Sequence, residues 1–179
     1  MLIAAMDRRK QDEPGSLRDN DGAVRPNDAY AVTYPDEDAA GRRSTEAKTV
    51  RVAAAVICDS ISEKKRIFAA ARGHGEYKGK WEFPGGKVEA GETSAQALAR
   101  EIREELAAGI RVGDLIATVE YDYPGFHLSM DCFWCEVVDG ELKLLEAEAC
   151  RWLSKDELGS VEWLPADETI IGIVGRQMG

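Results

Sequence analysis

The chain has 179 residues, and 33 acidic against 23 basic side chains give it a formal net charge of −10. Proteins that bind nucleic acid gather Lys and Arg on one face, so this balance argues against a nucleic-acid polymer as partner. The sequence contains no run of about 18 apolar residues, so no membrane span or membrane partner is expected. It starts without a basic leader or an apolar run of signal length, which predicts a cytoplasmic location.

The first 49 residues differ in composition from the rest of the chain. They hold three of the 6 prolines and neither Phe nor Trp, and their charges are mixed without apolar periodicity. All 4 Trp and all 4 Phe follow after residue 49. We therefore predict a disordered or loosely attached extension over 1–49 and one folded domain over 50–179.

The first elements of the domain are expected to be two strands and a helix. Residues 50–58 are rich in Val and small apolar residues and predict a buried strand, with 65–72 as its hairpin partner. Residues 93–107 are rich in Ala, Leu, Glu, Gln and Arg, which favours a helix. Thr93 followed by Gln96 has the spacing of a capping box, which places the helix start.

The remaining elements are mostly strands. Apolar residues alternate over 115–123 and 127–138, and Pro124-Gly125 between them favours a turn. Further expected elements are a tight turn at 139–140 leading to Leu142 and Leu144, a strand at 151–153, a helix capped by Ser154 and Glu157, and an apolar segment at 169–174. Strands outnumber helices and several are joined as hairpins. The pattern predicts an α+β fold with helices packed on a mixed sheet.

Four cysteines are present, and two of them form a C-x-x-C pair at Cys132 and Cys135. Such a pair could serve a redox or zinc site, but it lies in an alternating stretch typical of a strand. Residues i and i+3 of a strand point to opposite faces, and the second Cys/His pair that a zinc site needs is missing. Free thiols in a reducing compartment are the prediction.

Three carboxylates share one face of the predicted helix, because Glu101, Glu104 and Glu105 have i, i+3 and i+4 spacing. Like charges at these spacings destabilise a helix by about 0.2–0.5 kcal/mol per pair. A solvated helix face is one interpretation. The other is a hard divalent cation such as Mg²⁺, which binds one or two carboxylates together with substrate phosphates. A metal would also let an acidic protein bind a polyphosphate.

The surrounding spacing favours the metal. Residues 86–105 read G-x5-E-x7-R-E-I-x-E-E, and this motif resembles the Nudix box, the loop–helix–loop signature of the Nudix hydrolases. The sequence departs from the motif at one place: the Gly two residues past the last Glu is Ala107 here. The difference concerns the end of the helix more than the metal ligands.

The resemblance implies an α/β/α sandwich around a mixed sheet and hydrolysis of nucleoside diphosphates linked to another moiety. It implies Mg²⁺, with Mn²⁺ as a substitute, held by the Gly85 carbonyl and by the three glutamates, which also carry the catalysis: Glu101, Glu104 and Glu105. Either Glu101 or Glu105 would relay the proton. Gly86, with an ion pair between Glu92 and Arg100, would shape and orient the box.

Segments outside the box resemble the MutT branch, which includes 8-oxo-dGTP and CTP pyrophosphohydrolases; they lie at 67–72, 81–87, 120–124, 152–154 and 165–167. This resemblance makes Arg72 and Lys87 candidates for phosphate or sugar binding and Phe83 for stacking on a base. A surface arginine and a core phenylalanine are the structural alternatives. A carboxylate beyond the box commonly assists the metals, and Glu146 matches its position, with Glu148 as nearest competitor.

Asp167 lies where that branch places a base-reading Asn or Asp, although an N-cap of the last helix is an alternative role. An ionised Asp only accepts hydrogen bonds, so it suits a base with an amino group such as cytosine. Phe126 stands where a basic residue is expected in the best-known 8-oxo-guanine enzyme, which also favours cytosine slightly. His127 beside it is interpreted as a strand histidine.

The predicted function is Mg²⁺-dependent hydrolysis of a nucleoside or deoxynucleoside triphosphate to monophosphate and pyrophosphate, in sanitation of the nucleotide pool, with 8-oxo-dGTP or CTP and dCTP as substrate types. A Nudix hydrolase of ADP-ribose or dinucleoside polyphosphates is a second hypothesis. A catalytically silent nucleotide-binding module is a third, although a silent module has no chemical need for three clustered acids. The expected partner is the nucleotide alone, and the enzyme is expected to be a monomer or a homodimer.

Overall fold

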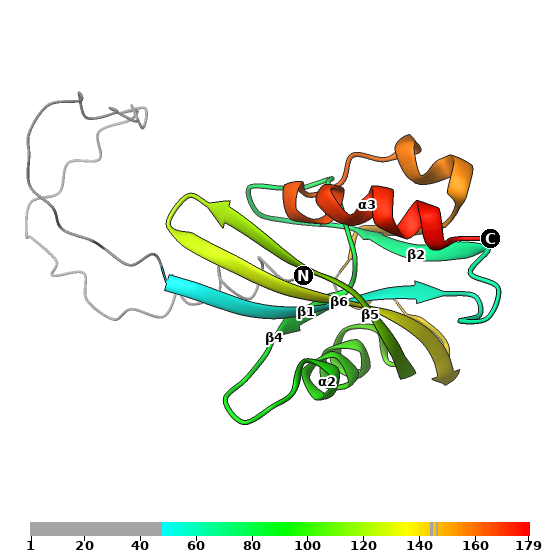
Figure 1. Ribbon diagram of the computed structural model, residues 1–179, viewed down its shortest axis with the longest axis horizontal. Helices are drawn as coiled ribbons and strands as arrows, with labels where there is room; N and C mark the ends of the chain where they lie inside the picture. Colours follow the sequence, from blue (N-terminus) through cyan, green and yellow to red (C-terminus); the bar gives the residue numbers. More distant parts are fainter. Residues whose placement is uncertain (1–47, 144, 146) are drawn as a thin grey trace, which may run out of the picture.

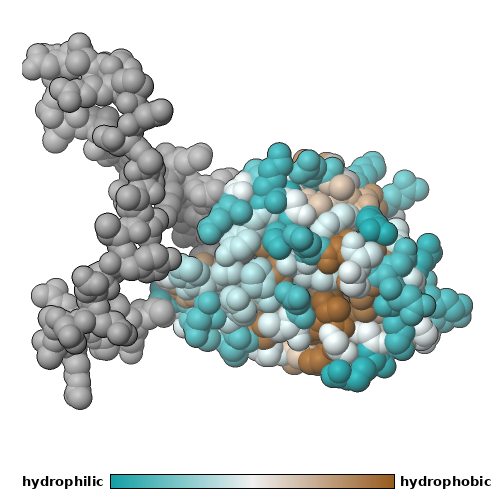
Figure 2. All heavy atoms as spheres, turned by 90° about the horizontal axis from the view of Figure 1, so that it is seen from above, coloured by the Kyte–Doolittle hydropathy of each residue, from teal (hydrophilic) through white to brown (hydrophobic). Residues whose placement is uncertain are grey.

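A computed structural model describes residues 48–143, 145 and 147–179 of the chain (Figure 1). The predicted extension over 1–49 lies outside the described residues except for Lys48 and Thr49, which begin the first strand. None of the helices within the described part is long and apolar enough to cross a membrane. Hydrophilic residues cover much of the face seen in Figure 2, with hydrophobic groups gathered near its middle.

The core of the fold is one mixed sheet in which β1 runs parallel to β6 and all other pairs are antiparallel. Its main path has the order β3-β2-β1-β6-β5, while β4 pairs with β1 and β7 with β2. The strands are β1 Lys48–Cys58, β2 Arg66–Ala71, β3 Trp81–Glu82, β4 Gly85–Lys87, β5 Gly109–Tyr123, β6 Phe126–Asp139 and β7 Ala149–Ser154. The predicted α+β sandwich around a mixed sheet is confirmed.

Helices cover both faces of the sheet. Helix α2 (Ser94–Leu106) lies on one face, and α3 (Pro165–Gln177) with the short 3₁₀-helix η2 (Lys155–Ser160) lies on the other (Figure 1). Strand β1 is buried on both faces, as expected of a central strand. Its Val52 and Val56 belong to the core cluster that contains α3 residues, whereas Ala53 and Ala55 belong to the cluster beneath α2.

The helix limits follow from local capping. Thr93 is the N-cap of α2, and the predicted capping box with Gln96 is present. Ser154 and Glu157 also form their predicted box, but the element they begin is a six-residue 3₁₀-helix. The apolar segment at 169–174 lies inside α3. This helix starts at Pro165 with Leu164 as its N-cap, so the alternative that Asp167 is the N-cap is wrong.

Strand β5 is longer than its alternating pattern predicts. The alternation was recognised from Leu115 onward, whereas the strand begins at Gly109. Its pairing with β6 shifts register between Val112 and Leu115 and again between Leu115 and Ala117. A bulge breaks the two-residue period of a strand, which removes the signal on which the prediction depends.

The C-x-x-C pair is split by the sheet. Cys132 belongs to the core cluster on the α3 side and Cys135 to the cluster on the α2 side. Both are buried free thiols, as is Cys58, while Cys150 is an exposed free thiol. The prediction of free thiols is confirmed, and two sulfurs on opposite faces cannot form a disulfide with each other or bind one zinc ion.

Helix α2 ends at a residue with a strained backbone. Ala107 is the C-cap and adopts the left-handed conformation, with φ 53° and ψ 27°. Glycine is favoured there because a Cβ costs about 1 kcal/mol or more in that region. We expect Ala107→Gly to raise the free energy of unfolding by about 0.5–1 kcal/mol in urea titrations. Ala95→Gly inside the same helix is the control and should lower it by about 1 kcal/mol. A loss of stability in both variants would contradict this interpretation.

Candidate active site

Two glycines bring β4 against β1 and leave room beside the strand. A Cβ on Gly85 would overlap the backbone of Ala53, so the close pairing of β4 with β1 requires glycine. A Cβ on Gly86 would overlap the carboxylate of Glu101. The carboxylate of Glu101 therefore rests directly on the backbone of Gly86, and helix α2 meets the two glycines of β4 at this contact.

Arg100 ties the loop before α2 to the helix. Its Nε and Nη2 donate to Glu92 Oε1 and Oε2, each at 2.9 Å, and its Nη2 also donates to the Lys87 carbonyl at 3.1 Å. Its Nη1 donates to Glu101 Oε1 at 2.7 Å. The hydrogen bonds from Arg100 lower the pKa of Glu92 to about 2. The ion pair between Glu92 and Arg100 is thus present and orients the loop as well as Glu101.

The three glutamates on α2 differ in their surroundings. Glu105 is buried, the Glu101 side chain is 17% exposed, and the Glu104 side chain is 61% exposed. Glu104 Oε2 lies 3.5 Å from Arg100 Nη1. Of the three glutamates, only Glu104 fits the interpretation of a solvated helix face. The other two carboxylates are held against the sheet, where like charges repel more strongly than in water.

Among the described residues, no three His, Cys, Asp or Glu side chains converge closely enough to enclose a metal ion. The cation that touches Glu101 and Glu104 in this structure is Arg100. The donor set nevertheless fits a hard divalent ion, since it consists of carboxylate and carbonyl oxygens alone. Glu146 lies outside the described residues. Its competitor Glu148 is exposed, and its N–H donates to the Ala71 carbonyl at 3.0 Å.

Arg72 is not a surface residue. Its side chain is 3% exposed, and its Nη1 lies 3.2 Å from Oε2 of Glu82, which is 2% exposed. Glu82 pairs with Ala70, and directly opposed residues of an antiparallel pair share a face. Ala70 belongs to the core cluster beneath α2, so this ion pair lies on the same side of the sheet as the glutamates.

Phe83 and Asp167 meet on the other side of the sheet. Phe83 is buried against Trp163, with ring centroids 4.9 Å apart, and its N–H donates to Asp167 Oδ1 at 2.9 Å. Burial raises the pKa of Asp167 to about 7, against the opposing effect of the Phe83 hydrogen bond. Asp167 therefore exists in protonated and ionised forms near neutral pH.

The sequence did not indicate that an aromatic cluster next to Asp167 is a candidate binding surface. The buried Tyr123 stacks on Phe126 with ring centroids 5.1 Å apart. The ring of Tyr77 contacts that of Tyr123 edge-on, with centroids 6.0 Å apart. The Tyr123 hydroxyl accepts a hydrogen bond of 3.4 Å from the N–H of Ala166, one residue before Asp167. Alternation alone could have placed Tyr121 and Tyr123 on one face. Tyr77 comes from a loop, and only the folded chain shows its contact.

The segment 81–87 connects these two regions. Glu82 faces the α2 side, its neighbour Phe83 belongs to the core on the α3 side, and Gly86 contacts Glu101. The structure thus gathers the candidate residues in two places. Carboxylates and cations lie beneath α2, and an aromatic surface with one titratable carboxyl group lies near the start of α3.

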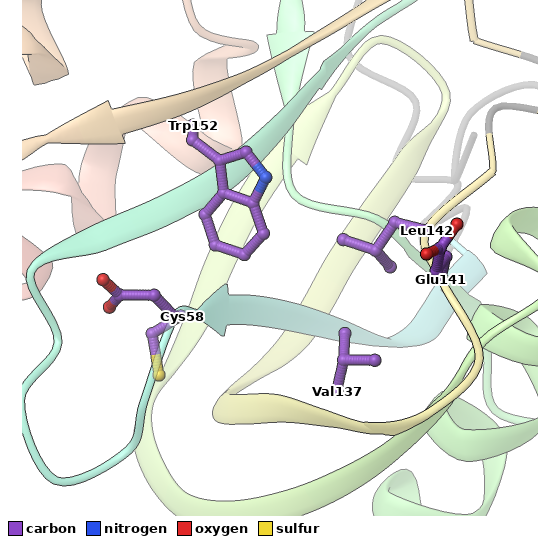
Figure 3. Close-up of a pocket in the computed structure, with 6 residues that line it drawn as sticks. Cys58, Val137, Glu141, Leu142 and Trp152 are labelled. Carbon is purple, nitrogen blue, oxygen red and sulfur yellow. The ribbon is translucent and has the colours of Figure 1, made fainter.

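A hollow of about 400 Å³ lies apart from both regions, at the carboxyl ends of β1 and β6 (Figure 3). It is lined by Cys58, Asp59, Val137, Glu141, Leu142 and Trp152. Its charged lining residues are acidic, and none of these six side chains is cationic. The hollow is a poor match for a polyphosphate.

His127 is held between two carboxylates on the α2 side of the β5–β6 hairpin. Its Nδ1 lies 2.6 Å from Asp122 Oδ1 and its Nε2 lies 2.7 Å from Glu120 Oε2. Both nitrogens can donate only in the protonated ring, and these hydrogen bonds raise the pKa of His127 above 6.5. The contacts fit a histidine that joins two strands.

This arrangement predicts a pH-dependent contribution to stability. Because the pKa is higher in the folded state, the contribution is fully present below about pH 6.5 and is lost as pH rises through the folded-state value. His127→Gln should therefore lower the melting temperature at about pH 5.5 and change it less at about pH 9. His74→Gln, in an exposed loop, is the control. A difference in melting temperature between the wild type and His127→Gln that grows with pH would contradict the prediction.

Comparison with known proteins identifies a match to the family model described as NUDIX domain over residues 49–171. The chain is 32% identical over 130 residues to the 8-oxo-dGTP diphosphatase of Escherichia coli (strain K12), covering 72% of this chain and 98% of that protein. It is 33% identical over 120 residues to the CTP pyrophosphohydrolase of the same strain, covering 67% and 87%. The crystal structure of the MutT protein from Methanosarcina mazei Go1 superposes with a TM-score of 0.62 at 27% identity, covering 75% and 96%.

Proposed function

The chain belongs to the NUDIX domain family, and from this premise we propose that it hydrolyses nucleoside triphosphates to monophosphate and pyrophosphate with the help of Mg²⁺. It is a hydrolase of the kind whose relatives are named diphosphatases and pyrophosphohydrolases. The observation that carries the proposal is the contact of Glu101 with Gly86. That contact brings the acidic face of α2 onto the two glycines of β4, where phosphate groups and metal would meet.

The glutamates of α2 would have two roles, as metal ligands and as proton acceptor. Glu101, Glu104, Glu105 and the Gly85 carbonyl would hold the metal, which when bound neutralises phosphate oxygens and lowers the pKa of a bound water. Mn²⁺ offers similar chemistry. Either Glu101 or Glu105 would accept the proton of the attacking water. Glu105 is buried and the Glu101 side chain is 17% exposed, so both carboxylates lie against the sheet.

The cationic side chains of the site would bind the substrate and orient the glutamates. Arg100 keeps Glu101 in place through its Nη1 while Glu92 occupies its other nitrogens. Lys87 directly follows the two glycines in β4 and would reach the phosphates from this strand. Arg72 is a candidate to contact the phosphates or the sugar directly, since its charge is balanced by the buried Glu82 and adds little to the long-range potential.

The nucleoside would bind on the aromatic side of the sheet, with Asp167 at the edge of the base. The preference for cytosine rested on an ionised Asp167 that only accepts hydrogen bonds. Since the pKa of Asp167 is raised to about 7, its protonated form can also donate to a carbonyl. Both 8-oxo-dGTP and CTP or dCTP thus remain substrate candidates, consistent with a role in sanitising the nucleotide pool.

Asp167→Asn tests this assignment through pH. In the wild type, the ratio of kcat/KM for dCTP to that for 8-oxo-dGTP should rise between about pH 6 and pH 8, since the ionised form accepts from the cytosine amino group. Asn does not titrate, so its ratio should stay flat. Because the raised pKa makes wild-type stability fall as pH rises toward 7, the variant should also gain relative stability at pH 8. The same pH dependence of the ratio in both proteins would refute the role of Asp167.

A panel of nucleotides with Mg²⁺ tests the function as a whole. The panel contains dCTP, 5-methyl-dCTP, CTP, dGTP, 8-oxo-dGTP and ADP-ribose, with pyrophosphate release measured for the triphosphates and phosphate monoester formation for ADP-ribose. Turnover of one or more triphosphates with release of pyrophosphate is expected. Turnover of ADP-ribose alone, or nucleotide binding without any turnover, would contradict the proposal.

A further inference from the structure

We propose that Asp131 is a positioning residue that fixes the start of helix α2 to the β5–β6 hairpin and thereby sets the place of the catalytic glutamates. The inference rests on the proposed function, because it takes the glutamates of α2 as the acidic residues of the active site. Asp131 belongs to β6 and lies outside the motif that carries those glutamates.

Asp131 uses its two carboxylate oxygens for two different elements. Its Oδ2 accepts a hydrogen bond of 2.6 Å from Ser94 Oγ, the first residue of α2. Its Oδ1 accepts one of 2.7 Å from Thr118 Oγ1, its cross-strand partner on β5. Hydrogen bonds from hydroxyl groups to a carboxylate are short and strong. One bond thus links the helix to the hairpin, while the other stays within the hairpin.

The helix spans a row of residues across the sheet. Asp131 lies beside Ala53 of β1, which lies beside Gly86 of β4. Two strand spacings amount to about 9.5 Å. Ser94 and Glu101 are seven residues apart in α2, so they share a face and lie about 10.5 Å apart along the helix axis. The two lengths match: Ser94 contacts Asp131 at one end of the row, and Glu101 contacts Gly86 at the other.

The carboxylate of Asp131 also supplies a charge that the helix itself lacks. The first turn of α2 contains no acidic residue, although a negative charge there would interact favourably with the helix dipole. Ser94, which donates to this carboxylate, is buried. Without this contact, α2 would still be held at Gly86 and Arg100, but its N-terminal end would be free to move. Small displacements of catalytic groups lower rates strongly.

The test compares two variants that each remove one hydroxyl donor from the same carboxylate. Ser94→Ala breaks the bond to the helix, and Thr118→Val breaks the bond within the hairpin. Both should lower the melting temperature by similar small amounts. Only Ser94→Ala should lower kcat, by about tenfold or more, with little change in KM, on whichever nucleotide the wild type turns over.

Substitutions of Asp131 complete the test. Asp131→Ala should lower kcat as Ser94→Ala does, whereas Asp131→Asn should restore it to within about threefold of wild type, because one amide oxygen can still accept from Ser94. Equal kcat values for Ser94→Ala and Thr118→Val, or an Asn variant as slow as the Ala variant, would overturn the proposal. A wild-type protein that turns over no triphosphate would instead refute the proposed function.

Discussion

Replacing Glu104 with Gln is expected to lower kcat by about two to three orders of magnitude with Mg²⁺. The substitution keeps the size of the side chain and removes one anionic oxygen ligand, and loss of a single electrostatic contact in an active site commonly has an effect of about this size. The Glu104 side chain is 61% exposed, so the fold does not depend on it. Without metal, the variant should be as stable as the wild type or slightly more stable, since relief of the repulsion from Glu101 offsets the weakened contact with Arg100.

The matched control for this variant is Glu168→Gln. Glu168 is an exposed glutamate in the first turn of α3, which covers the other face of the sheet from α2. Both variants lose one negative charge from the surface, so a general effect of net charge would appear in both. A Glu104→Gln enzyme with wild-type turnover would show that this carboxylate is not a metal ligand.

Gly86→Ala is expected to lower kcat by about 100-fold through a single added methyl group. The new Cβ would occupy the position of the Glu101 carboxylate and displace it from β4. Because the overlap is with the end of a side chain, the fold should survive. A displacement of about 1 Å in a catalytic group is sufficient for an effect of this size. Steady-state kinetics with the best triphosphate of the panel measure it.

Two other glycines separate the effect on the site from effects on the fold. Gly159→Ala in η2 meets no heavy atom within 4 Å and should leave kcat and stability unchanged. Gly85→Ala would overlap the backbone of Ala53 and should destabilise the pairing of β4 with β1. If Gly86→Ala keeps a wild-type kcat, the position of Glu101 against Gly86 has no role in catalysis.

Local signals predicted helix α2 well. The capping box at Thr93 and the end near Ala107 are both present, because caps and helix formers act within a few residues of each other. The motif over 86–105 predicted the family for a similar reason, since its spacing is local. Strand β5 was predicted only in part, because its bulges hide the alternation before Leu115.

Contacts between distant segments could not be predicted in this way. The burial of Arg72 depends on the pairing of β2 with β3, which places Glu82 opposite Ala70 and within reach of the Arg72 side chain, and a strand-end arginine is more often exposed. The raised pKa of Asp167 depends on its burial beneath Phe83, although the sequence alone suggested an ordinary ionised Asp. Likewise, the contact of Ser94 with Asp131 requires the register of β6 against β1. Register and burial are properties of the whole sheet.

The most direct test of the account is a titration with Mn²⁺, followed by electron paramagnetic resonance of the free ion, in the presence of a non-hydrolysable nucleoside triphosphate analogue. Mn²⁺ replaces Mg²⁺ here because its spectrum reports binding without turnover. The wild type is expected to bind the ion, and Glu104→Gln is expected to weaken this binding by about tenfold or more, while Glu168→Gln leaves it unchanged. Equal binding by wild type and Glu104→Gln would contradict the account.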